Sequence, residues 1–153
     1  MSGEWITSSE EETRAIGERL ASELLPRGRC LLFGPMGSGK TVLAQGIARG
    51  LGIEPREVQS PTFTLAREHQ GPRARLLHLD LYRIEPGDLT GAGIDEMLEA
   101  DAVVVVEWAE RLPVAWRAGA RAFRLERLDA DRHRIVEIAP SSGECGPNAG
   151  GVR

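Results

Sequence analysis

Residues 31–50 read LLFGPMGSGKTVLAQGIARG, and this stretch decides the fold. The apolar run RCLLFG at 29–34 has the length of a strand, and from Gly39 to Gly50 apolar residues recur at helical spacing. Between them, residues 34–41 match G-x-x-x-x-G-K-[ST] at every fixed position. A strand, a glycine-rich loop and a helix in this order are the context that a phosphate-binding P-loop requires.

Each residue type in such a loop has a physical role. Glycines let the backbone wrap around phosphates with its N–H groups pointing inward, and the helix N-terminus adds its positive dipole end. Lys40 is the only lysine of the chain, and its compact ammonium suits a place beneath a glycine loop better than the broad arginine fork. We expect Lys40 to reach the β and γ phosphates and the Thr41 hydroxyl to bind Mg²⁺. The alternative is a glycine-rich turn without a ligand. The expected nucleotide contacts are Gly34, Pro35, Met36, Gly37, Ser38, Gly39, Lys40 and Thr41.

The length and composition of the chain are typical of a single globular domain. The chain has 153 residues, 41% of them hydrophobic and 27% charged, with a net charge of −4. The negative net charge argues against a protein that binds nucleic acid without a partner. No apolar run approaches the roughly 20 residues of a membrane span, and the acidic N-terminus lacks the features of a secretory signal. We expect a cytoplasmic protein with one P-loop domain at 1–140 and a disordered, glycine-rich tail at 141–153.

The remaining segments alternate between strand and helix patterns, which predicts an α/β fold of the P-loop NTPase type. Its sheet is expected to be mainly parallel and flanked by helices, with an antiparallel hairpin at the C-terminal end. Cys30 lies in an apolar run and is expected to be a buried hydrophobic residue. The predicted elements are a helix from Ser9 to about Leu25, a loop entering a strand at 60–69, a strand at 74–83, a helix at 94–100, a strand at 101–110, and a hairpin turning at 129–131.

Two acidic residues end two apolar strands. Asp80 follows LLHL at 76–79, and Glu107 follows four valines at 103–106. Ligands of open α/β sheets bind outside the carboxyl ends of the strands, so both acids are expected to face the nucleotide. Either could hold Mg²⁺ or orient an attacking water, and the spacing does not decide which. Each could also be a solvated strand end.

Two further features admit a functional and a purely structural interpretation. Ser60-Pro61-Thr62 follows the P-loop helix, where switch proteins place a residue that senses the γ-phosphate, but a plain loop fits the local sequence equally. Strand alternation puts His78 on the face of Asp80, so His78 is either a site residue or a buried histidine with a structural partner. His69 and His133 are expected on the surface.

Several classes of protein share the P-loop. A G protein needs an N-K-x-D segment, and the only lysine is already in the loop, which excludes that class. A small-molecule kinase remains a rival, with Arg111, Arg117 and Arg121 as candidate lid residues, although the resemblance to shikimate kinases covers the loop only. A binding module with a vestigial loop is a third interpretation.

Four segments together resemble one family. GPMGSGKT at 34–41, SPTFTL at 60–65, HLDLYRI at 78–84 and EW at 107–108, in this order and spacing, are similar to the TsaE family of bacteria. The resemblance covers about residues 6 to 138. It departs from the family at Pro35, where an acid is common, and at Val42, where a second threonine is common.

The resemblance implies a small P-loop ATPase with slow hydrolysis. Such proteins assist TsaD and TsaB in forming threonylcarbamoyladenosine at position 37 of tRNA. Nucleotide-dependent association resets that pair for repeated turnover, while TsaD performs the transfer, so contact with tRNA is indirect. The implied cofactors are ATP or ADP and Mg²⁺, and no membrane is involved.

The resemblance also assigns roles to individual residues. It makes Lys40 the phosphate ligand, Thr41 and Glu107 the Mg²⁺ side, and Asp80 a second essential acid. It makes Thr62 a switch residue and places Trp108 beside the active site. Near the adenine it places Ile6 and Glu10, with a hairpin at Asp131 and Arg132 covering the nucleotide.

Overall fold

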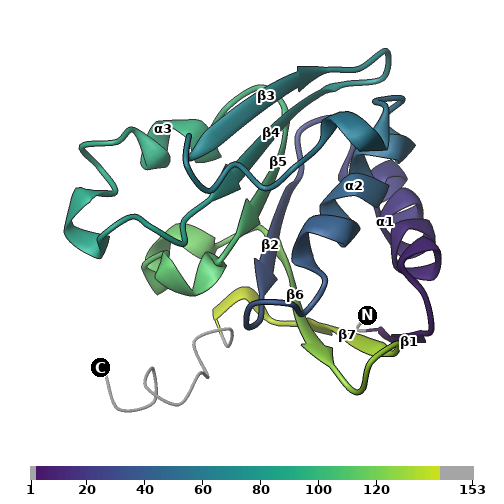
Figure 1. The fold of residues 1–153 in the computed structure, drawn as a ribbon. Coiled ribbons are helices and arrows are strands. Elements are labelled where there is room, and N and C mark those ends of the chain that lie inside the picture. Colours follow the sequence, from purple (N-terminus) through teal and green to yellow (C-terminus); the bar gives the residue numbers. More distant parts are fainter. Residues whose placement is uncertain (1–2, 142–153) are drawn as a thin grey trace.

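A seven-stranded sheet organises the protein in the computed structural model, which describes residues 3–141 (Figure 1). Apart from Ser141, the tail predicted to be disordered lies outside the described residues. The strand order is β1-β7-β6-β2-β5-β4-β3. The strands are β1 (Glu4–Thr7), β2 (Arg29–Phe33), β3 (Ala66–Gln70), β4 (Arg75–Asp80), β5 (Val103–Glu107), β6 (Arg121–Arg127) and β7 (His133–Ile138). The α-helices are α1 (Glu10–Leu24), α2 (Lys40–Gly50) and α3 (Ile94–Leu98), and the 3-10 turns are η1 (Pro55–Glu57), η2 (Pro86–Asp88), η3 (Ala109–Arg111) and η4 (Val114–Arg117).

The centre of the sheet is parallel and both of its sides are antiparallel. Strands β6, β2, β5 and β4 pair in parallel. The predicted hairpin of β6 and β7 is confirmed, and β1 extends it as an antiparallel edge. Strand β3 forms a second antiparallel edge on β4. The predicted α/β class is therefore confirmed, while the sequence analysis did not anticipate β1 or the direction of β3.

Helices cover both faces of the sheet, and the alternation of the central strands builds two cores. Helices α1 and α2 lie together on one face, while α3 and the 3-10 turns after β5 lie on the other (Figure 1). In β2, Cys30 and Leu32 join the core beneath α1 and α2, whereas Leu31 and Phe33 join the opposite core. The four valines of β5 divide in the same way, which explains why this strand is uniformly apolar.

Helix α1 begins where its sequence predicts. Ser9 is the N-cap, and its hydroxyl accepts a hydrogen bond from the Glu12 N–H at 3.1 Å. The Glu12 side chain in turn accepts from the Ser8 N–H. The helix packs closely on α2 at Gly46, where a Cβ would lie 2.1 Å from the Arg14 carbonyl oxygen. None of the helices within residues 3–141 is long and apolar enough to cross a membrane.

Candidate functional site

The P-loop connects the end of β2 to the start of α2, as the motif predicts. Gly37 and Gly39 have φ of 81° and 104°, which side-chain-bearing residues rarely adopt. Gly34 has φ of 144°, and a Cβ there would lie 2.4 Å from the Leu125 carbonyl oxygen of β6. The glycines are thus required by backbone conformation and by the close approach of a neighbouring strand.

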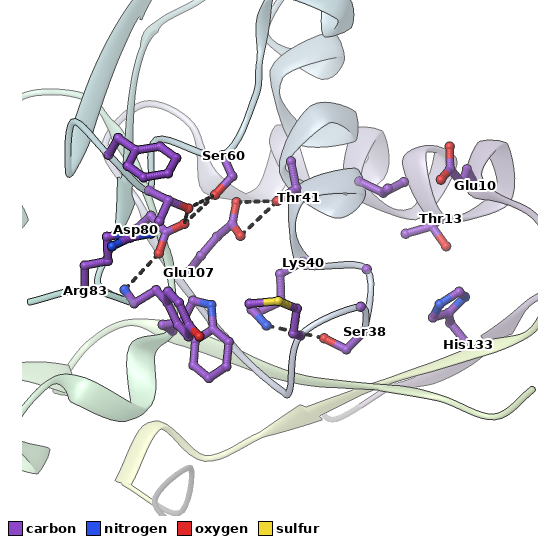
Figure 2. Close-up of a pocket in the computed structure, with 18 residues that line it drawn as sticks. Glu10, Thr13, Ser38, Lys40, Thr41, Ser60, Asp80, Arg83, Glu107 and His133 are labelled. Atoms are coloured by element: carbon purple, nitrogen blue, oxygen red, sulfur yellow. Dashed lines mark hydrogen bonds between the residues drawn. The ribbon is translucent and has the colours of Figure 1, made fainter.

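A cavity of about 520 Å³ lies over this loop. Figure 2 shows the carboxylates of Asp80 and Glu107 toward one end, Glu10 and His133 toward the other, and Lys40 between them. The cavity is lined by Glu10, Thr13, Met36, Gly37, Ser38, Gly39, Lys40, Thr41, Val42, Ser60, Thr62, Phe63, Asp80, Tyr82, Arg83, Glu107, Trp108 and His133. All five residues expected to be catalytic line this cavity, because the P-loop and the carboxyl ends of β4 and β5 share one edge of the sheet: Lys40, Thr62, Asp80, Glu107 and Trp108. Of the P-loop residues expected to contact the nucleotide, Gly34 and Pro35 do not line it.

The Lys40 side chain folds back onto the P-loop. Its Nζ donates to the carbonyl oxygens of Gly34 at 2.5 Å and Pro35 at 2.9 Å. The ammonium also lies 4.2 Å from the centroid of the Trp108 ring. Burial lowers the pKa of Lys40, and the neighbouring carboxylates, with Glu110 foremost, act to raise it. The lysine is therefore a partly desolvated cation beside the cavity, suited to an anionic ligand.

Glu107 is the meeting point of two side chains from other elements. The Thr41 hydroxyl donates to Glu107 Oε1 at 2.9 Å and to Oε2 at 3.0 Å. His78 Nε2 lies 2.7 Å from Oε2, and the His78 side chain is fully buried. His78 Nδ1 has no hydrogen-bond partner among the described residues. The open question about His78 thus resolves to a buried histidine that fixes a site carboxylate.

Asp80 holds the segment that follows α2. The hydroxyls of Ser60 and Thr62 both donate to Asp80 Oδ2, the latter at 2.7 Å, and the two hydroxyl oxygens are 2.9 Å apart. Asp80 Oδ1 accepts from the Tyr82 backbone N–H at 2.9 Å. Asp80 and Glu107 are direct partners in the parallel register of β4 and β5, so two acids stand side by side at the end of the sheet.

Aromatic side chains form the rim of the cavity. Trp108 has φ of 59°, an uncommon value for a bulky residue, and its ring lies 4.9 Å from that of Tyr82. Phe63 is 84% exposed, and the Arg83 guanidinium lies 4.4 Å from its ring centroid. Phe63 and Arg83 directly follow residues that Asp80 binds, so the rim is tied to that carboxylate.

The opposite end of the cavity contains one residue the sequence analysis misplaced. His133 was expected on the surface, but β7 brings it to the cavity, where its Cδ2 would lie 3.7 Å from a Cβ on Gly39. Glu10 lines this end as expected. Ile6 and Arg132 do not line the cavity: Ile6 is half exposed on β1, and Arg132 pairs with Asp129. Their expected contacts with the nucleotide remain predictions.

The candidate lid of the kinase interpretation does not form at this cavity. Arg111, Arg117 and Arg121 are absent from its lining. Arg111 donates to the Ile84 carbonyl, Arg117 is buried against the Leu112 carbonyl, and Arg121 pairs with acidic side chains. These arginines have structural partners, which removes the feature that favoured a metabolite kinase.

The oxygen atoms of the site fit a magnesium ion that also binds phosphate. Within residues 3–141 no three His, Cys, Asp or Glu side chains are grouped to hold a metal. Mg²⁺ in nucleotide sites typically uses one or two protein oxygens, with phosphates and waters completing the set. The adjacent oxygens of Thr41 and Glu107 meet that requirement.

Comparisons with known proteins agree on one family. The family model described as threonylcarbamoyl adenosine biosynthesis protein TsaE matches residues 7–136. A Mycobacterium tuberculosis protein named tRNA threonylcarbamoyladenosine biosynthesis protein TsaE is 39% identical over 136 residues, covering 82% of this chain and 80% of its own. The protein of the same name from Bacillus subtilis is 41% identical over 113 residues, covering 71% and 70%. The crystal structure of Bacillus subtilis YdiB superposes with a TM-score of 0.68 at 30% identity, over 91% of this chain and 86% of that one.

Proposed function

The chain belongs to the TsaE family of tRNA threonylcarbamoyladenosine biosynthesis proteins, and we propose that it serves this process as an ATP-dependent switch. Its role is in the formation of threonylcarbamoyladenosine in tRNA. The proposal adds that it acts in the cytoplasm through TsaD and TsaB, and that it touches tRNA only through them. One observation supports the proposed switch above all others. The P-loop lysine Lys40, the hydrogen-bonded pair Thr41 and Glu107, and the hydrogen-bonded pair Thr62 and Asp80 all line the same cavity.

The phosphate end of the proposed ATP site is the P-loop. The loop N–H groups and the N-terminus of α2 attract phosphate oxygens, and the buried Lys40 ammonium supplies a compensating charge. To reach a β or γ phosphate, Lys40 must exchange its carbonyl contacts at Gly34 and Pro35 for phosphate oxygens. The nucleoside then extends toward Glu10 and His133.

The proposed metal side is Thr41 with Glu107. Mg²⁺, when bound, neutralises the phosphates and polarises them toward attack. Two side chains would set up this metal site. His78 orients the Glu107 carboxylate, and Thr41 exchanges its hydrogen bond for a metal contact. Asp80 is left as the acid that orients water. The arginine that lines the cavity, Arg83, lies against the Phe63 ring, and we expect hydrolysis by the chain alone to be slow.

The proposed switch is the segment at 60–63. Its two hydroxyls share one oxygen of Asp80, so a γ-phosphate that attracts the Thr62 hydroxyl would leave the segment bound to that carboxylate through Ser60 alone and would loosen it. Phe63 and Arg83 would then move with it, altering the surface offered to the TsaB–TsaD pair. Nucleotide state would in this way be converted into partner affinity.

The test is the association of the chain with the purified TsaB–TsaD pair, measured by sedimentation with ATP, with ADP and without nucleotide. The proposal expects affinity for the pair to differ at least about tenfold between ATP and ADP, a coupling free energy within the usual allosteric range. Equal affinity in all three states would contradict the switch, and a failure of the chain to bind either nucleotide would contradict the whole proposal.

A further inference from the structure

Glu110 lies in η3, one turn after Glu107 and Trp108, and reaches back to the P-loop. Its Oε2 accepts a hydrogen bond from the Gly34 N–H at 2.9 Å, joining residues 76 positions apart. Glu110 does not line the cavity, so it is placed to act on the loop and not on a ligand. Its other oxygen, Oε1, is buried and has no hydrogen-bond partner among the described residues. Gly34 is therefore the hydrogen-bond partner that the structure gives this side chain.

The backbone that carries Glu110 is held by a buried arginine. The Arg117 side chain, 2% exposed, donates to the Leu112 carbonyl at 2.8 Å and to the Glu110 carbonyl at 3.4 Å. Its guanidinium lies 5.2 Å from the centroid of the Phe33 ring, and Phe33 directly precedes Gly34. The turn bearing Glu110 is thus anchored beside the strand end from which the loop departs.

The Gly34 residue that Glu110 binds is constrained on every side. Its φ of 144° and its close approach to the Leu125 carbonyl leave no room for a side chain. Its N–H is taken by Glu110, and its carbonyl oxygen accepts from Lys40 Nζ at 2.5 Å. Because the N–H and the C=O of Gly34 are held by Glu110 and Lys40, displacement of one contact would shift the other.

We propose that Glu110 is a positioning residue of the P-loop, whose hydrogen bond to the Gly34 N–H sets the loop in the conformation that receives phosphate. The inference rests on the proposed ATP binding. For this hydrogen bond the required property is an acceptor oxygen at that distance, and the negative charge of Glu110, which acts on Lys40, is a separate property. A glutamine retains such an oxygen, whereas an aspartate retains the charge but is shorter by one methylene group.

The test compares Glu110→Gln, Glu110→Asp and Glu110→Ala with the wild-type chain, and uses Glu99→Ala as the control. Glu99 is an exposed acid paired with Arg29 and is absent from the cavity lining. Two quantities are measured: hydrogen exchange of the Gly34 amide without nucleotide, and ATP affinity by calorimetry. We expect Glu110→Gln and the control Glu99→Ala to keep the Gly34 amide protected and to bind ATP with about the affinity of the wild-type chain. Asp and Ala should lose protection and weaken binding about tenfold, as expected when a buried donor loses its partner.

The outcomes separate this inference from the proposed function. Loss of protection and of affinity in the Gln variant, with Asp unchanged, would show that charge and not the hydrogen bond matters, and would overturn the inference. Wild-type affinity and protection in the Asp and Ala variants would also overturn it. If the wild-type chain itself bound no ATP, the proposed function would fail, while the amide measurement would still decide whether Glu110 sets the loop.

Discussion

The Thr41 hydroxyl donates to both carboxylate oxygens of Glu107, at 2.9 and 3.0 Å, across 66 residues of sequence. The contact joins the first turn of α2 to the end of β5, so the P-loop, for which we propose phosphate binding, is tied to the strand that supplies an acid. A hydroxyl and a carboxylate at this distance can bind one Mg²⁺ together when phosphate is present.

We predict that Thr41→Ala weakens Mg²⁺-dependent ATP binding by about tenfold or more, because it removes a proposed metal ligand and leaves His78 as the remaining side chain that contacts the Glu107 carboxylate. Calorimetric titrations with Mg²⁺ and with EDTA measure the effect. Binding in EDTA should change little, and Thr41→Ser should restore the Mg²⁺ dependence. Equal weakening in both media would show that Thr41 supports the loop and not the metal.

The Ser60 and Thr62 hydroxyls, which both bind Asp80, should contribute to stability together. Ser60 and Thr62 donate to the same oxygen, so either one alone keeps part of the interaction. We therefore expect Ser60→Ala and Thr62→Ala each to lower the free energy of unfolding modestly, and the double variant to lower it by about 1 kcal/mol beyond the sum. Urea denaturation gives these values. A double variant that matches the sum within about 0.3 kcal/mol would refute the shared role.

The packing of α1 on α2 predicts a large cost at Gly46. Alanine is the better helix former, but its Cβ would lie 2.1 Å from the Arg14 carbonyl oxygen. We expect Gly46→Ala to lower the free energy of unfolding by about 1–3 kcal/mol, since the two helices must move apart. Gly87→Ala is the matched control, because its Cβ would meet nothing within 4 Å. A thermal denaturation curve for Gly46→Ala that overlays the wild-type curve would contradict this packing.

Cys30 should be inert in the folded protein and should make stability fall at high pH. Burial raises the pKa of its thiol from 9.0 to about 12. Below pH 9 the thiol is neutral in both states. As pH rises from 9 toward 12 only the unfolded state releases the proton, so this residue's contribution to stability is lost. In a Cys145→Ser background, iodoacetamide at pH 8.5 should label the chain in denaturant but not when folded. Rapid labelling of the folded chain would show that Cys30 is accessible.

Some features could be predicted because each of them depends on residues that lie close together in the sequence. The P-loop at 34–41, the N-cap at Ser9 and the strand-ending acids Asp80 and Glu107 needed only spacing and apolar patterning. The parallel register of β4 and β5 then necessarily places those two acids together.

The rest depends on tertiary placement that a single sequence does not encode locally. Strand β1 is a four-residue edge whose pairing with β7 is set by the finished hairpin. His133 reaches the cavity because of the β6–β7 register, and Glu110 reaches Gly34 because η3 turns back beneath the loop. For Glu110 a signal did exist, since an acid one helical turn after Glu107 shares its edge of the sheet, but its partner is a backbone N–H that no motif marks.

The central claim is that nucleotide binding by this chain drives repeated formation of threonylcarbamoyladenosine in tRNA. The most direct test counts the modified tRNA molecules formed per TsaD in a reaction with TsaB, tRNA and a threonylcarbamoyl donor, with ATP and either the wild-type chain or Lys40→Ala. We predict several modifications per TsaD with the wild-type chain. With Lys40→Ala we predict no more than without any added chain, because the variant lacks the ammonium for which we propose phosphate binding. Equal stimulation by both chains, or none by the wild type, would contradict the account.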